Sequence, residues 1–166
     1  MSLARQLAER FTALHYEDLP PEAFYWSRIA VMDTVGVMLA GAIEAAPRIL
    51  EDVLGLHAGS GPSLIFGTSR RASALDAALI NGTAAHALDF DNTANRMGGH
   101  VSATLVPALI AAAEAFGASG REVLLAHAAG FETGARIGSA VNYYHTEKGW
   151  HPTSTLGVFA VAAACA

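Results

Sequence analysis

The sequence has little charge, one cysteine and one lysine. Only 15% of its 166 residues are charged, against roughly 25% in an ordinary soluble domain. The lone cysteine, Cys165, excludes an internal disulfide framework and suits a reducing compartment, so a cytoplasmic location is expected. Lys148 is the only lysine, which leaves one position for catalysis by an amine. The net charge of −5, with no basic cluster beyond Arg70 and Arg71, disfavours nucleic-acid partners.

Long hydrophobic runs are also missing, although 52% of the residues are hydrophobic and the mean hydropathy is +0.34. The longest apolar stretches, residues 101–113 and 156–166, are shorter than the roughly 18–20 residues that cross a membrane. The N-terminal segment MSLARQLAERF lacks the apolar segment and cleavage site of a signal peptide. We therefore expect no membrane partner. The apolar surface should be buried within the helices, or should meet a partner or a missing part of the chain.

Apolar residues recur at helical spacing along most of the chain. The expected fold is all-α and forms one domain over residues 1–166, with a loop at 59–71 that holds a short extended piece at 63–66. The expected helices span residues 3–16, 18–39, 47–57, 72–88, 102–116, 119–141 and 153–166. The last helix has neither a cap nor a charge where the sequence stops. This predicts that the chain is the first part of a longer protein.

A polar cluster, HALDFDNT at residues 86–93, interrupts the apolar sequence. If the fourth helix continues through it, steps of three and four residues place His86, Asp89 and Thr93 on one face. The same geometry points Asp91 away from that face. Such an arrangement would set a carboxylate and a hydroxyl at the mouth of a pocket. The alternative is that this segment merely ends the helix, because Asn and Thr favour caps and turns.

The loop that follows, ANRMGGH at residues 94–100, adds Arg96 and His100. Its two glycines would let the backbone pass close to a ligand. Arg96 is a candidate clamp for a substrate carboxylate. A metal site formed by His86, Asp89 and His100 is the less favoured alternative, because the spacing His-x-x-Asp is a weak indication of metal binding.

A second polar cluster, GWHPTSTLG at residues 149–157, places His151 just before the last helix. The free N–H groups of that helix start would favour an anion, so His151 could donate a proton or contact a carboxylate there. The alternative is a loop histidine packed on Trp150. We interpret the remaining histidines as surface or core residues: His15, His57, His127 and His145. We interpret Asp33 as a buried core carboxylate.

Four segments, in this order, resemble the MmgE/PrpD family: NGTAAHALDFDNT, GHVSATLVPALIAAAEA, SGREVLLAHAAGFETGARIG and GWHPTSTLGVFAVAAA. That family includes 2-methylcitrate dehydratase, cis-aconitate decarboxylase and iminodisuccinate epimerase. The resemblance implies that this chain is the N-terminal portion of the family's helical domain. It also implies that the later helical segments and the α+β lid domain lie beyond residue 166, and that the site uses neither a metal nor another cofactor.

The resemblance carries the family's catalytic residues onto Asp89, Thr93, His100 and His151. The family's catalytic lysine, and a histidine and a tyrosine of its lid, have no match here, and Lys148 is not at the lysine position. The chain departs from the family pattern where DFDNT replaces DFDDT and where HVS replaces HPS. These departures leave the substrate open.

The whole protein is therefore expected to be a 2-methylcitrate dehydratase-like lyase that removes a proton beside a carboxylate of a small di- or tricarboxylate. The alternatives are a cis-aconitate decarboxylase-like or iminodisuccinate epimerase-like enzyme, or a non-catalytic helical module. Asp89 should lie within about 10 Å of His100 or His151. The chain should form a homo-oligomer, a dimer, through apolar faces at 101–113 and 155–166. By itself it should be inactive.

Overall fold

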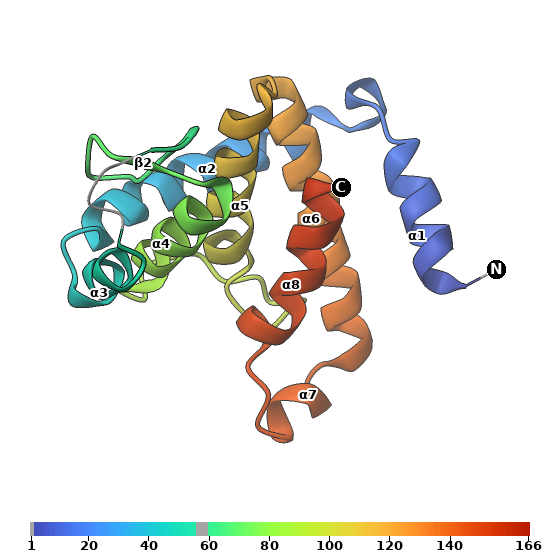
Figure 1. Cartoon of the computed structure of the whole chain (residues 1–166). Coiled ribbons are helices and arrows are strands. Elements are labelled where there is room, and N and C mark those ends of the chain that lie inside the picture. The colour runs from blue at the N-terminus through green and yellow to red at the C-terminus, as the bar shows by residue number, and fades with distance from the viewer. Residues whose placement is uncertain (1, 56–59) are drawn as a thin grey trace.

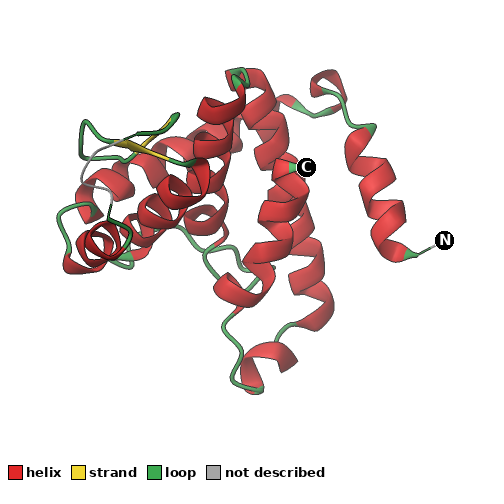
Figure 2. Cartoon of the chain, viewed as in Figure 1, coloured by secondary structure: helices red, strands yellow, loops and turns green. Residues whose placement is uncertain are grey.

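The computed structural model describes residues 2–55 and 60–166, and this part of the chain is almost entirely helical (Figures 1 and 2). The α-helices are α1 (Leu3–Thr12), α2 (Pro21–Gly41), α3 (Ala45–Val53), α4 (Ala74–His86), α5 (Val101–Phe116), α6 (Gly120–Val141), α7 (Tyr144–Glu147) and α8 (Pro152–Cys165). A 3-10 turn, η1 (Tyr16–Asp18), follows α1. The strands β1 (Ser63–Leu64) and β2 (Arg71–Ala72) form one short antiparallel pair. The predicted all-α fold is confirmed.

α4 ends earlier than its sequence pattern predicts, and this shapes the polar cluster. Ser73 caps the first turn by accepting a backbone N–H at 3.1 Å, and the helix runs only to His86. The chain then leaves helical geometry, because Asp89 has a φ of +54°, in the left-handed region that Asp tolerates better than most residues. The prediction of a helix over 72–88 is therefore too long at both ends. The helical face predicted for His86, Asp89 and Thr93 does not exist.

Other helix ends differ from the predictions with less consequence. The helix predicted over 3–16 stops at Thr12, and the one predicted over 47–57 is α3, which ends at Val53. The end of that predicted helix, together with the interpretation of His57, lies outside the described residues. The extended piece expected at 63–66 is present as β1.

α5 is the central helix of the structure. It packs against α4 on one side and against α6 and α8 on the other, and Figure 1 shows it between them. Half of its side chains are buried: Val101, Ser102, Ala103, Leu105, Val106, Pro107, Leu109 and Ala111. The expectation that residues 101–113 expose an apolar face is therefore wrong, because three neighbouring helices cover this segment.

α2 is apolar on both of its faces. The inner face packs against α4, α5 and α6 through Phe24, Ser27, Thr34, Met38 and Gly41. The outer face carries exposed large side chains: Tyr25, Trp26, Ile29, Met32 and Leu39. Asp33 lies on the exposed side, so its predicted burial is wrong; a helix that is apolar all round does not indicate which face turns inward.

Apolar surface is also exposed on α8, where Val158 is 58% exposed and Phe159 is 53% exposed. This agrees with the expectation for residues 155–166. Figure 1 shows α1 set apart from the main bundle, and Phe159 lines an apolar groove between α1, α6 and α8. Within the described residues no single helix is long and apolar enough to cross a membrane; α2 and α3 meet that standard only as a pair, across a bend of 79°.

His127, on α6, is a core histidine. Its side chain is buried, and its Nδ1 lies 3.0 Å from the hydroxyl of Ser27 on α2. Burial lowers the pKa of the His127 imidazole to about 4, from roughly 6.5 in an unfolded chain. The folded protein therefore holds this ring neutral at pH values where the unfolded chain protonates it.

This difference predicts a specific loss of stability in acid. Between about pH 6.5 and pH 4 the unfolded state binds the extra proton, so stability falls as the pH is lowered. From pH 7 to pH 5 the contribution is about 2 kcal/mol. His127→Gln cannot titrate, so its free energy of unfolding, measured in urea at both pH values, should change by about 2 kcal/mol less than that of the wild type. An identical pH dependence in both proteins would contradict this assignment.

Candidate active site

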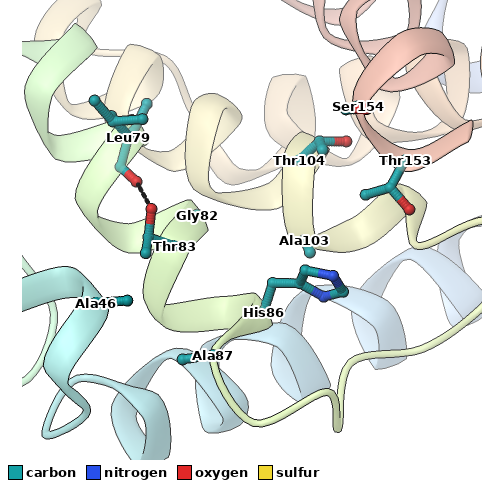
Figure 3. Close-up of a pocket in the computed structure, with 11 residues that line it drawn as sticks. Ala46, Leu79, Gly82, Thr83, His86, Ala87, Ala103, Thr104, Thr153 and Ser154 are labelled. Carbon is teal, nitrogen blue, oxygen red and sulfur yellow. Dashed lines mark hydrogen bonds between the residues drawn. The ribbon is translucent and has the colours of Figure 1, made fainter. Parts of the chain in front are cut away.

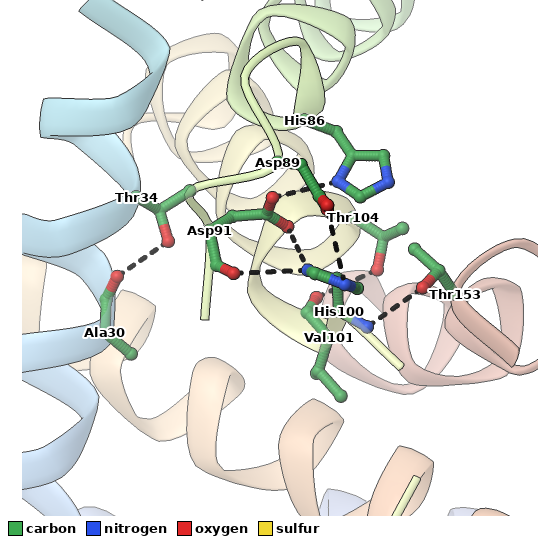
Figure 4. Close-up of polar contacts among 9 residues, drawn as sticks. All are labelled: Ala30, Thr34, His86, Asp89, Asp91, His100, Val101, Thr104 and Thr153. Carbon is green, nitrogen blue, oxygen red and sulfur yellow. Dashed lines mark hydrogen bonds and ion pairs between the residues drawn. The ribbon is translucent and has the colours of Figure 1, made fainter. Parts of the chain in front are cut away.

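The polar cluster centres on Asp91, in the turn between α4 and α5 (Figure 4). Its side chain is 0% exposed and lies between two imidazoles. Asp91 Oδ1 is 2.9 Å from His86 Nδ1, and Asp91 Oδ2 is 3.0 Å from His100 Nδ1. The two rings pack edge to face with their centroids 4.8 Å apart. One buried carboxylate therefore holds a histidine from the end of α4 and another from the start of α5.

His100 is held from three directions. Its backbone N–H donates to the Thr153 hydroxyl at 2.9 Å, which ties the start of α5 to the start of α8. Its Nδ1 also lies 3.2 Å from the main-chain carbonyl oxygen of Asp91. Its Nε2 lies on the other side of the ring, 3.7 Å from Asp89 Oδ1. Because Asp89 is 81% exposed, the Nε2 side of His100 faces outward.

His100 Nδ1 is close to the Asp91 carboxylate, but its hydrogen bond is made with the main-chain carbonyl of Asp91. Nδ1 makes its hydrogen bond with the Asp91 carbonyl, and Asp91 Oδ2, although 3.0 Å away, has no hydrogen-bond partner among the described residues. A buried carboxylate oxygen without a hydrogen bond costs free energy, typically on the order of 1–3 kcal/mol or more when charged.

The structure brings together some of the predicted site residues and not others. Asp89 lies beside His100, well inside the 10 Å limit. Thr93 and Arg96 are exposed, and within the described chain neither side chain makes a hydrogen bond or an ion pair. His151 is the exposed N-cap residue of α8.

The surroundings of His151 bear on the two interpretations of the second cluster without testing the role proposed for His151. Trp150 stacks on His145, with ring centroids 6.2 Å apart, rather than on His151. At the helix start the N–H groups of Ser154 and Thr155 already bond to the His151 carbonyl. The helix start therefore offers an anion fewer free donors than predicted. The role of His151 stays a prediction.

Sequence reasoning missed His86 and Asp91 as a pair. Asp91 was expected to point away from the cluster because the helix was extended through it. The run Asn92, Thr93 and Asn95, which favours caps and turns, was the available indication that the helix ends sooner. Because the chain turns at Asp89, the Asp91 side chain points into the protein and lies between the two imidazole rings.

A pocket of about 520 Å³ opens beside this cluster (Figure 3). It lies between α4, α5 and the start of α8, with one residue from α3. Its lining is mostly apolar, and its polar groups are His86 and the hydroxyls of Thr83, Thr104, Thr153 and Ser154. Small-molecule sites have this character, an apolar cavity with a few placed polar groups. His86 belongs to both the pocket and the Asp91 cluster.

The cluster also has the composition of a cation site. His86, Asp89, Asp91 and His100 each offer one ligand atom, and these atoms lie within 4.8 Å of one another. In the present geometry, however, His86 and Asp91 are in direct hydrogen-bond contact at 2.9 Å, which requires a proton between them. A metal ion would have to displace that proton. The hydrogen bond between His86 and Asp91 is the arrangement expected of an acid–base cluster.

An all-helical domain with two imidazoles on one buried carboxylate beside a pocket defines a domain suited to acid–base chemistry on a small molecule. Comparison with known proteins makes this specific. The chain belongs to the family described as the MmgE/PrpD N-terminal domain, whose model matches residues 5–166. The resemblance noted in the sequence is thereby confirmed.

Its relatives are longer proteins. The chain is 29% identical over 177 residues to the cis-aconitate decarboxylase-like protein oryM of Aspergillus oryzae, covering 98% of this chain and 36% of that protein. It is 28% identical to the cis-aconitate decarboxylase of Homo sapiens, with 98% and 35% covered, and 24% identical to that of Aspergillus terreus, with 89% and 31% covered. The chain thus spans about a third of the length of the curated relatives it matches.

Proposed function

We propose that the protein carrying this domain is a lyase that acts on a small di- or tricarboxylate, with the decarboxylation of cis-aconitate as the first reaction to test. The geometry that supports this most directly is His100, whose Nδ1 is engaged inside the protein and whose Nε2 faces Asp89 and solvent. Decarboxylation is tested first because the relatives are named as cis-aconitate decarboxylases or as a protein like them. Dehydration of 2-methylcitrate, the first expectation from the sequence, is the second candidate, and epimerisation of iminodisuccinate is the third.

The proposed chemistry uses His100 Nε2 as the proton carrier. In a decarboxylation, the bond between carbon and a carboxylate breaks, carbon dioxide leaves, and the electron pair stays on carbon. Protonated His100 then delivers its Nε2 proton to that carbon, or to the carbon at the far end of an adjacent double bond that shares the electron pair, as in cis-aconitate. In a dehydration, neutral Nε2 takes a proton from the carbon beside a carboxylate, and the hydroxyl leaves, after protonation, as water. Asp89 Oδ1, 3.7 Å from Nε2, sets negative charge beside that nitrogen in either case.

Substrate binding must offset like charge, because Asp89 and Asp91 both lie at the site. Arg96 is exposed and free of ion pairs within the described residues, so it is available to a substrate carboxylate. Thr93 and His151, also exposed, are proposed as further contacts. No metal is required in this scheme.

The test offers cis-aconitate, 2-methylcitrate and iminodisuccinate separately to the protein at the length of its relatives. We expect saturable turnover of at least one of them. We expect none from the 166-residue chain alone, because the family's lysine and lid residues have no match in it. Failure of all three substrates with a folded protein would overturn the proposed function. Turnover that a chelator abolishes and Zn²⁺ restores would instead assign the cluster to a metal.

We also propose that the chain self-associates through the outer face of α2. The large apolar side chains exposed there would otherwise remain in water, at roughly 25 cal/mol per Å². Sedimentation at micromolar concentration should show a species of about twice 17.2 kDa. Met32→Glu should shift it to monomer, whereas Leu75→Glu, at a residue that is 84% exposed on α4, should not. A clean monomer in the unsubstituted chain would contradict this.

A further inference from the structure

We propose that Asp91 is a positioning residue that fixes the tautomers of two histidines, and that His86 is a second imidazole of the active site, with its Nε2 available to the pocket. The catalytic role of His86 in this proposal rests on the proposed function. The assignment of tautomers does not, because it concerns only which nitrogen of each ring carries a proton. Neither His86 nor Asp91 is among the residues that the family resemblance carries over.

The tautomers follow from the chemistry of the partners. His86 Nδ1 faces Asp91 Oδ1 at 2.9 Å, and an ionised carboxylate oxygen can only accept a hydrogen bond. His100 Nδ1 faces the Asp91 main-chain carbonyl oxygen at 3.2 Å, and a carbonyl oxygen likewise only accepts. Both rings must therefore carry a hydrogen on Nδ1. When the rings are neutral, the lone pair of each is on Nε2.

The two Nε2 atoms face different surroundings. That of His100 lies near Asp89, on the outward side of the cluster. The His86 side chain is 38% exposed and lines the pocket, and among the described residues its Nε2 has no hydrogen-bond partner (Figure 3). His86 lines the pocket and His100 does not, but the two ring centroids are only 4.8 Å apart, so the proposal requires a substrate that extends past His86 to His100. We assign His100 to the reacting carbon and His86 to a substrate carboxylate, to which it donates in the imidazolium form that carries a hydrogen on both ring nitrogens.

The unpartnered Asp91 oxygen supports a positioning role. Asp91 Oδ2 lies 3.0 Å from His100 Nδ1 and has no hydrogen bond to the described residues, so its charge is next to that nitrogen without being directed to another group there. Because the hydrogen of the neutral ring is on Nδ1, His100 can take up a proton at Nε2 and release it again without turning its ring.

The tautomers can be measured on the 166-residue chain by long-range ¹H–¹⁵N spectra at about pH 8, where ordinary imidazoles are neutral. Signals are assigned with His86→Gln and His100→Gln. We expect both rings in the Nδ1–H form. Asp91→Asn offers one acceptor and one donor in place of two acceptors, so at least one ring should change to Nε2–H. Asp89→Asn, which alters only the exposed side of His100, should change neither.

The Nε2–H form in both rings of the wild-type chain would overturn the proposal, and this result does not depend on whether any variant folds. An Asp91→Asn protein that folds with unchanged tautomers would overturn the part assigned to Asp91.

The role of His86 is read from kinetics in the longer protein. His86→Ala should raise KM about tenfold or more with a smaller change in kcat, and His86→Gln, which keeps a donor near the Nε2 position, should recover part of the loss. A fall in kcat with KM unchanged would exclude carboxylate binding by His86. Expected tautomers together with no turnover of any polycarboxylate would reject the proposed function and leave the positioning role intact.

Discussion

Replacing His100 with glutamine in the longer protein should lower kcat/KM for its polycarboxylate substrate by about 10²–10⁴-fold, the usual effect of losing a general acid or base. Glutamine can hydrogen bond in the place of His100 Nδ1 or Nε2, but it cannot carry a proton near neutral pH. The loss should appear mainly in kcat, because proton transfer belongs to the chemical step. Initial rates measured over a range of substrate concentrations separate the two parameters.

His15→Gln is the matched control. His15 is exposed beside η1, distant in sequence from the polar cluster, and the same replacement there should change kcat/KM by less than about twofold. A His100→Gln protein that is folded and retains wild-type kcat would remove His100 from the chemistry and with it the mechanism proposed for this site.

Gly41→Ala should give the largest loss of stability among the conservative changes considered for this fold, about 3 kcal/mol in the free energy of unfolding. A Cβ at Gly41 would lie 2.0 Å from the main-chain carbonyl oxygen of Ala84 on α4. Because that neighbour is backbone, the two helices would have to separate. Ala84 is two residues from His86, so the same shift should disturb the end of α4 that holds this ring.

Gly36→Ala is its control in the same helix. Gly36 is exposed on α2, and a Cβ there meets nothing within 4 Å. Alanine has the higher helix propensity, so this change should stabilise the protein by roughly 0.5–1 kcal/mol. Urea unfolding of the two variants should therefore move in opposite directions. Equal losses would mean that α2 and α4 are not packed as closely as the structure has them.

The helices could be predicted because apolar periodicity and capping residues are local properties of the sequence. Ser119 with Glu122, for example, forms the capping box that begins α6. Periodicity does not indicate which face of α2 is buried, because both faces are apolar. The prediction that Asp33 lies in the core was wrong for this reason. The burial of residues 101–113 depends on α4, α6 and α8 together, which no local pattern reports.

The site was predicted in part. Asp89 and His100 came from the family resemblance and do lie together. Asp91 was missed because its position depends on one backbone angle, the φ of +54° at Asp89, that ends the helical register. Once the helix has ended, helical spacing no longer tells which way a later side chain points. It therefore predicted the wrong direction for the Asp91 side chain. His86 could be placed near the cluster but not paired with it, since pairing needs the direction of Asp91.

The central claim is that His100 delivers or removes a proton beside a carboxylate of a small polycarboxylate. The most direct test incubates the longer protein with carboxyl-¹³C-labelled cis-aconitate in D₂O and follows the reaction by NMR. The account predicts release of labelled carbon dioxide, one deuterium on carbon in the decarboxylated product, and loss of both signals in His100→Gln. Labelled carbon dioxide released at the wild-type rate by a folded His100→Gln protein would contradict it.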